Sequence, residues 1–271
     1  MNELLIIGGT AACGHALRSF AHPLTRRVGA LCYLAATYLA GWLLSGSHLA
    51  GAAALSAWFF LPWVEIVLRI RHLRLPLTRR LLPRLPPSRR DFPQLAELSE
   101  ELEAEGFTQV DDIGLDWEEM HQFLRLYYHA PTRTEAAIHL NQQAAMSVAF
   151  VSITCRACGG RVLTTTNYPF AQSMPSPPKV QLHPVPAADS FVELLAEHRS
   201  TLALLHIAHD DLQSADEAAL PALLEADLDS QVQHSLRRGL ITASGEGTFR
   251  YSWRGCFYLW GQFLKDMIRF A

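Results

Sequence analysis

The sequence VGALCYLAATYLAGWLLSG, residues 28–46, contains nineteen residues and no charged side chain. At 1.5 Å of rise per residue, a helix of this length roughly matches the hydrocarbon core of a bilayer, which is about 30 Å thick. A second apolar run, LAGAAALSAWFFLPWVEIVL, follows at residues 49–68 after a short polar break and contains one charged residue, Glu65. The two runs predict a transmembrane helical hairpin over residues 28–68.

Glu65 is the intramembrane polar residue of this hairpin. It lies four residues before Arg69, which is the helical spacing for an acid and a base to pair, and it is close to the end of the run. We therefore favour pairing at the membrane surface over a proton carrier or a contact with another membrane subunit. The small residues at 51–56 would let another helix approach closely, so we expect a partner membrane protein or a second copy of the chain.

Arginines flank the hairpin on both sides and are missing from its turn. The positive-inside rule places such arginines in the cytoplasm, so we expect a two-pass protein of a bacterial inner membrane with both termini cytoplasmic. Residues 1–27 lack the basic start of a signal peptide, and we expect them to form an interfacial segment. The flanking arginines are Arg18, Arg26 and Arg27 before the hairpin, and Arg69, Arg71 and Arg74 after it.

Residues 69–91 form an arginine- and proline-rich juxtamembrane linker, with eight arginines and no acid before Asp91. Clusters of this kind are attracted to anionic lipids, and the prolines favour an extended spacer. The membrane already accounts for the positive charge, so we do not expect nucleic-acid binding. The residues expected at the membrane surface are Arg69, Arg71, Arg74, Arg79 and Arg80.

Residues 92–271 are long enough for one compact core, which we expect to be a cytoplasmic α+β domain with a mostly antiparallel sheet and packed helices. The patterns predict the hairpin of residues 145–166, and also a helix over 116–128 from an apolar stripe spaced three and four residues apart. The aromatic helix at the C-terminus, residues 255–270, is expected to close this core, with a position at the membrane interface as the alternative. Further helices are predicted over 93–105, 190–209 and 228–238, and further strands over 107–113, 134–140, 239–241 and 248–253.

The proline-rich stretch after the predicted hairpin, residues 167–186, is expected to be a long ordered loop. Loops of this length often carry function, and this one adjoins a polar run at the end of a strand. We therefore predict a ligand or partner site there. Its candidate residues are Thr164, Thr165, Asn167, Tyr168 and His183.

Metal-ligand patterns are sparse. Cys155 and Cys158 form one Cys-x-x-Cys pair, whereas a structural zinc ion takes four ligands and no second pair exists. His206, His209 and Asp210 would lie on one face of a helix. These residues are weak candidates, and we expect neither a metal nor another cofactor. The cysteines, five in number, do not form a secreted disulfide framework, which favours a reducing compartment.

The residues near 228–253, a helix followed by two strands, resemble half of a winged-helix domain, with Arg237, Arg238, Arg250 and Arg254 available for phosphates. The chain contains no phosphate-binding loop, dinucleotide fingerprint, hydrolase elbow or zincin motif. We expect a non-enzymatic accessory subunit or regulatory module of a membrane complex. The alternatives are a membrane-tethered enzyme with a pocket near residues 164–168 and a membrane-bound winged-helix regulator.

Overall fold

The computed structural model describes residues 2–20, 23–118, 120–143 and 146–270, and the chain forms two compact units. The first, which we call the helical unit, comprises Met1–Leu73 and Arg250–Ala271. The second, the sheet unit, comprises Arg74–Phe249. The protein is therefore mixed α+β, as the sequence predicts.

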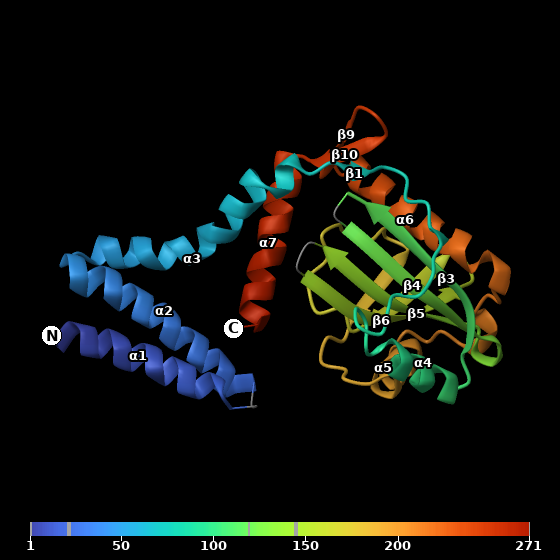
Figure 1. Ribbon diagram of the computed structural model, residues 1–271, viewed down its shortest axis with the longest axis horizontal. Coiled ribbons are helices and arrows are strands. Elements are labelled where there is room, and N and C mark those ends of the chain that lie inside the picture. Colours follow the sequence, from blue (N-terminus) through green and yellow to red (C-terminus); the bar gives the residue numbers. More distant parts are fainter. Residues whose placement is uncertain (1, 21–22, 119, 144–145, 271) are drawn as a thin grey trace. The chain divides into compact units, whose positions relative to one another are not determined.

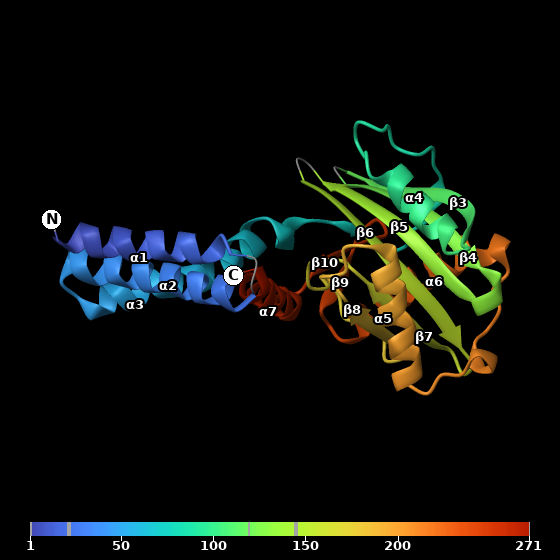
Figure 2. The same ribbon diagram turned by 90° about the horizontal axis from the view of Figure 1, so that it is seen from below.

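Among its described residues, the helical unit contains four α-helices. Consecutive helices α1, α2 and α3 run antiparallel side by side (Figures 1 and 2), and the C-terminal helix α7 packs against the second half of α3. In that contact the Trp63 and Phe257 ring centroids are 4.6 Å apart, and Trp260 Nε1 donates a 2.7 Å hydrogen bond to the carbonyl of Phe59. The bounds are α1 Asn2–Arg18, α2 Pro23–Ser45, α3 His48–Leu68 and α7 Trp253–Phe270.

Two segments of this unit, Val28–Ser45 and His48–His72, are long and apolar enough to cross a membrane, by length and composition. In each, only 11% of the residues are buried, so they differ from the core helices of a water-soluble domain. Large apolar side chains such as Leu31, Phe60 and Leu61 are more than half exposed.

The sheet unit is built on a seven-stranded sheet in the order β2-β3-β4-β5-β6-β7-β8. All neighbours are antiparallel except β7 and β8, which are parallel. A smaller sheet has the order β1-β10-β9. The strands are β1 Leu75–Pro76, β2 Leu82–Pro83, β3 Thr108–Trp117, β4 Met120–His129, β5 Thr134–Gln143, β6 Met146–Ala157, β7 Arg161–Thr166, β8 Val180–Pro184, β9 Ile241–Ser244 and β10 Thr248–Tyr251.

Helices cover both faces of the large sheet (Figures 1 and 2). On one face, α4 (Leu95–Ala104) and α5 (Phe191–Leu204) enclose a core around Tyr127, Ile138 and Ile153. On the other face, α6 (Leu220–Arg237) packs over Leu124, Leu126 and neighbouring side chains. A strand in the middle of such a sheet must be apolar on both sides.

The predicted helix over residues 116–128 is wrong for this reason. The segment forms the end of β3 and most of β4, with Phe123 and Tyr127 on the α5 face and Leu124 and Leu126 on the α6 face. Apolar residues on both faces of a strand produce the same three- and four-residue spacings as one face of a helix.

The β6–β7 hairpin is confirmed, with Gly159 and Gly160 at φ of +83° and +76° in its turn. The two strands predicted after α6 are confirmed as well, and they pair as β9 and β10. The loop expected over residues 167–186 is shorter, because Val180–Pro184 pairs with β7 as an edge strand. Edge strands tolerate the proline that ends this one.

The two units do not coincide with the predicted linker, residues 69–91, and the predicted domain, residues 92–271. Within the expected linker, β1 pairs with β10 and β2 pairs with β3, so residues 74–91 already belong to the sheet unit. The aromatic C-terminal helix packs on α3 and groups with the helical unit, because its tryptophans contact Phe60 and Trp63.

Candidate functional site

A cavity of about 300 Å³ lies on the α6 face of the large sheet, which is the lower end of the range for small-molecule sites. Its floor is formed by β5 to β8, one wall by α6, and its rim by the loop between β7 and β8. Among the described residues that line it, Arg79 is the one permanent cation and Asp227 the one acid, so their charges balance.

His139 and Asn141 occupy alternate positions on β5 and therefore point to the same side of the sheet, into the cavity. His139 Nε2 is 2.7 Å from Ser152 Oγ on the neighbouring strand. Its ring stacks on Phe150, with centroids 4.4 Å apart and planes inclined by 5°. Burial lowers the pKa of His139 to about 4, so the imidazole is neutral at neutral pH.

Two polar atoms on this floor have no hydrogen-bond partner within the described part of the chain. They are His139 Nδ1 and Asn141 Oδ1, and both are buried. An unpaired buried polar group costs about 1–3 kcal/mol, so each of these atoms would be stabilised by a hydrogen-bond partner. A group that enters the cavity can satisfy both.

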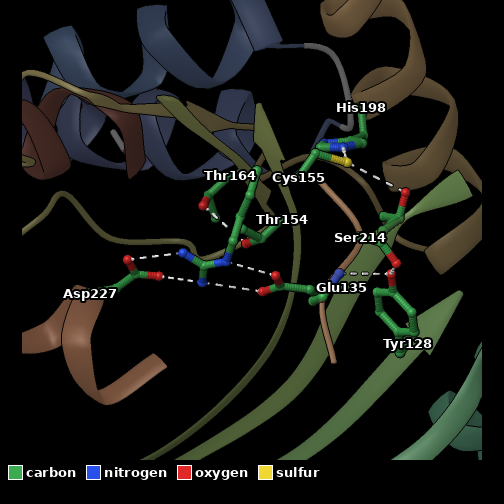
Figure 3. A network of polar contacts seen from close by, with 11 residues as sticks. Tyr128, Glu135, Thr154, Cys155, Thr164, His198, Ser214 and Asp227 are labelled. Atoms are coloured by element: carbon green, nitrogen blue, oxygen red, sulfur yellow. Dashed lines mark hydrogen bonds and ion pairs between the residues drawn. The ribbon is translucent and has the colours of Figure 1, made fainter. Parts of the chain in front are cut away.

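An ion cluster borders the cavity. Arg156 of β6 lies between Glu135 of β5 and Asp227 of α6, with Nε 2.7 Å from Glu135 Oε1 and Nη2 2.6 Å from Asp227 Oδ2 (Figure 3). Burial raises the pKa of Glu135, and the Arg156 guanidinium opposes that shift. The cluster fixes α6 to the sheet, and its one guanidinium is shared between the two carboxylates.

The rim loop is held at two points. Asn167 Oδ1 accepts a 2.7 Å hydrogen bond from the amide of Val151, and Asn167 Nδ2 donates to the carbonyl of Ala188. From α6, Gln231 Nε2 donates a 3.1 Å hydrogen bond to the carbonyl of Met174. Tyr168 packs against Phe150, with ring centroids 4.7 Å apart. The loop therefore forms an ordered edge of the cavity.

The residues predicted from the sequence as a ligand site do not all lie on the same face of the sheet. Thr164 and Tyr168 line the cavity, and the Thr164 hydroxyl is 3.0 Å from that of Thr154 (Figure 3). Thr165 lies on the opposite face, 2.8 Å from His198 Nδ1, and His183 pairs with Thr165 in register on β8. Asn167 positions the loop instead of lining the cavity.

The principal floor residues, His139, Asn141 and Ser152, were missed. In the sequence they are polar residues at alternate positions of otherwise apolar strands. The two stretches are AAIHLNQ, residues 136–142, and AFVSIT, residues 149–154. That pattern equally fits a strand face exposed to water, and only the packing of α6 above it distinguishes the two.

On the opposite face, Cys155, His198 and Thr165 form a buried chain of hydrogen bonds. Figure 3 shows Cys155 and His198 side by side. His198 Nε2 is 3.1 Å from Cys155 Sγ, and all three side chains are at most 1% exposed. Burial raises the pKa of Cys155 to about 11 and lowers the pKa of His198 to about 4. The pair therefore remains a neutral thiol and a neutral imidazole, which is an inert arrangement.

The candidate metal ligands do not assemble. Cys155 is buried while Cys158 is exposed in the β6–β7 turn. The predicted helix over 190–209 ends at Leu204, and His206 takes a left-handed φ of 52°, so His206 and Asp210 do not share a helix face. His209 instead has Nε2 2.8 Å from the carbonyl of Pro131. Within the described ranges, no three acidic, histidine or cysteine side chains cluster as metal ligands.

The residues expected at the membrane surface take different positions. Arg69 lies 3.4 Å from Glu65, as the spacing predicts, and both side chains are more than half exposed. The Arg71 guanidinium lies 3.8 Å above the centre of the Trp253 ring. Arg74 contributes its carbonyl to the indole of Trp117, Arg79 lines the cavity, and Arg80 is exposed.

The winged-helix resemblance extends to α6 and the β9–β10 hairpin and no further. The segments that precede α6 in the described chain are short turns at His209–Asp211 and Glu217–Ala219, not the first helix of a helix-turn-helix. Comparison with protein-family models, with curated proteins and with solved structures finds no match to this chain.

Proposed function

We propose that this protein is a membrane-anchored regulatory module that binds a small uncharged molecule in the cavity between the large sheet and α6. The observation that supports the proposal most strongly is the pair of buried, unpartnered atoms His139 Nδ1 and Asn141 Oδ1 on the cavity floor. A ligand that donates a hydrogen bond to Asn141 and pairs with the neutral imidazole satisfies both.

The cavity chemistry defines the ligand class. The floor groups are neutral, and the single cation and acid of the lining balance each other. Phe150, Tyr168 and Leu228 supply apolar surface beside these polar groups. A site of this kind suits a compact molecule with an apolar body and one polar edge.

The membrane anchor is the predicted hairpin of α2 and α3. Arginines before and after it favour a cytoplasmic sheet unit in a bacterial cell, and we propose that ligand binding there regulates a partner membrane protein or a second copy of the chain. The exposed apolar side chains of α2 and α3 support lipid as their surroundings.

A thermal-shift experiment tests ligand binding. The full-length protein in detergent is melted with and without a small-molecule extract of the cells that produce it. Binding at one hundred times the Kd adds about 2.7 kcal/mol of stability, so the melting temperature should rise. Leu228→Trp, which fills the cavity from α6, should abolish the rise. Leu223→Trp, on the same helix but outside the cavity lining, should preserve it.

Two outcomes would count against binding in the cavity. One is an extract that leaves the wild-type melting temperature unchanged at every concentration. The other is an equal rise in the wild type and in Leu228→Trp.

A membrane-tethered enzyme is the second candidate, and the Ser152–His139 hydrogen bond favours it. A serine hydroxyl 2.7 Å from a neutral imidazole has the geometry of a nucleophile and its base. A serine-directed fluorophosphonate probe should label the wild type and not Ser152→Ala if the pair is catalytic. Equal labelling of both proteins, or of neither, would reject this candidate.

A further inference from the structure

Helix α1 lies against α2 with their backbones in close contact. A Cβ atom at Gly29 of α2 would lie 2.7 Å from the carbonyl oxygen of Gly14 of α1, and one at Gly14 would lie 2.9 Å from the carbonyl oxygen of Gly29. Only glycine permits this approach, which is how small residues let membrane helices pack tightly.

Side chains around this glycine contact join the same two helices. The side chains of Cys13 and Cys32 are neighbours across the contact, and Tyr33 Oη is 3.4 Å from His15 Nδ1. The Arg18 guanidinium lies 6.0 Å from the centre of the Tyr33 ring. The helices therefore lie antiparallel along their length, as Figures 1 and 2 also show.

The surface of α1 away from this contact is apolar and exposed. Leu4, Leu5 and Ile6 are 64%, 69% and 51% exposed, and no Asp, Glu, Lys or Arg lies between Glu3 and Arg18. The 17 residues of α1 rise about 25 Å, which reaches across most of a hydrocarbon core when the end residues extend to the interfaces.

We infer that α1 is a third membrane-spanning helix, with Leu4, Leu5 and Ile6 in contact with lipid acyl chains. The inference rests on the proposed membrane anchoring: a helix that lies along α2 shares the medium that surrounds α2. With three antiparallel spans, the Asn2 end of α1 and the α2–α3 turn lie outside the cytoplasm. This arrangement differs from the interfacial segment and cytoplasmic N-terminus that the sequence predicts.

Charge supports this topology. The end of α1 contains Arg18 and the start of α2 contains Arg26 and Arg27, and this end of the helix pair lies on the cytoplasmic side, whereas the other end of α1 contains the acid Glu3. The positive-inside rule is therefore obeyed at each of the three spans.

Cysteine labelling in intact bacterial cells with a membrane-impermeant maleimide tests the topology. The background is the full-length chain without Cys13, Cys32 and Cys158, which retains the buried Cys155 and Cys256. Three reporters are compared in it: Asn2→Cys, Ser47→Cys in the α2–α3 turn, and restored Cys158 in the sheet unit. Asn2→Cys and Ser47→Cys should be labelled in intact cells, and Cys158 only after the inner membrane is permeabilised.

The labelling separates the two proposals. If Ser47→Cys is labelled in intact cells and Asn2→Cys is not, α1 does not span and the hairpin stands. If Ser47→Cys is protected as well, the membrane hairpin itself is overturned and the third span with it.

Oxidative cross-linking of the unmodified chain provides a second measurement that needs no variant. Copper phenanthroline in native membranes removes two electrons and two protons from the thiols of Cys13 and Cys32 and leaves a disulfide. Tryptic cleavage after Arg18, Arg27 and Arg69 should then yield the peptides of residues 1–18 and 28–69 joined by a disulfide. Recovery of both cysteines as separate, fully alkylated peptides would overturn the packing of α1 on α2.

Discussion

At the scale of single residues, the cavity floor contains polar groups that the fold does not need. Two asparagines, Asn141 and Asn167, show the difference between a side chain without and with hydrogen-bond partners. Asn141 Oδ1 has no partner among the described residues, whereas Asn167 satisfies the amide of Val151 and the carbonyl of Ala188. Residues retained for binding are often kept at a cost in stability.

Asn141→Leu should therefore stabilise the ligand-free protein by about 1 kcal/mol, since it removes a buried, unsatisfied oxygen. Asn167→Leu should destabilise it by about 2 kcal/mol, because two backbone groups lose their partner. The urea midpoint of the full-length protein in detergent, followed by β-sheet circular dichroism, measures both. A loss of stability in Asn141→Leu as large as that in Asn167→Leu would show that Asn141 is structural.

Two buried histidines give the sheet unit a pH dependence. The pKa values of His139 and His198 are lowered to about 4 by burial, so in acid the unfolded chain binds protons that the folded chain does not. Stability should fall as the pH decreases from about 6.5, by about 1.4 kcal/mol per pH unit for each histidine.

Urea midpoints of the full-length protein between pH 7 and pH 5 test this dependence. His198→Gln should remove the share of the slope that belongs to His198, whereas the shares of His139, His129 and His234, whose pKa values burial also lowers, should remain. A slope that is unchanged in His198→Gln would contradict the proposed origin.

Part of the cavity lining could be predicted from the sequence. Thr164 and Tyr168 were predicted because they adjoin a proline-rich loop, and both line the cavity. His139 and Asn141 could not be singled out, because the strand that contains them gives no sign of which face α6 covers. Thr165 follows Thr164 in the strand and therefore points to the opposite face of the sheet. Asn167 precedes Tyr168, but its side chain anchors the loop instead of lining the cavity.

At the scale of elements, close packing of glycines organises the helical unit. A Cβ atom at Gly41 of α2 would lie 2.6 Å from the carbonyl oxygen of Ala50 of α3, whereas one at Gly9 of α1 would meet nothing within 4 Å. The two positions are thus a matched pair for testing the α2–α3 contact.

Gly41→Ala should destabilise the helical unit by about 1–3 kcal/mol, because the two backbones must separate to admit the methyl group. Gly9→Ala should be neutral or stabilising by up to about 1 kcal/mol, because alanine favours the helix. Thermal unfolding of the full-length protein in detergent, followed at α-helical wavelengths, compares the two. Equal effects would show that Gly41 does not set the contact.

Elements were predicted well where local chemistry decides them. The β6–β7 hairpin follows from its turn glycines, and α4 and α5 follow from their apolar stripes. The failure at 116–128 arises from the burial of β4 on both faces, which only the tertiary arrangement creates. The short strands β1 and β2 lie in a stretch rich in arginine and proline, where local propensity predicts no strand.

At the scale of the whole molecule, the sequence separates an apolar N-terminal part from a mixed α+β part, and the structure contains both. The sequence does not indicate that α7 belongs with the N-terminal helices, because its aromatic stripe fits a core as well as a neighbouring apolar helix. The β1–β10 pair joins segments from near the two ends of the sheet unit, a contact between residues more than 170 positions apart that no local pattern can predict.

Native mass spectrometry of the full-length protein, purified from bacterial cells and released intact from detergent, tests ligand binding most directly. The wild type and Leu223→Trp should each retain one small organic molecule that Leu228→Trp lacks. A wild-type protein that retains nothing but lipid, or the same small molecule bound to all three proteins, would contradict a binding site between α6 and the sheet.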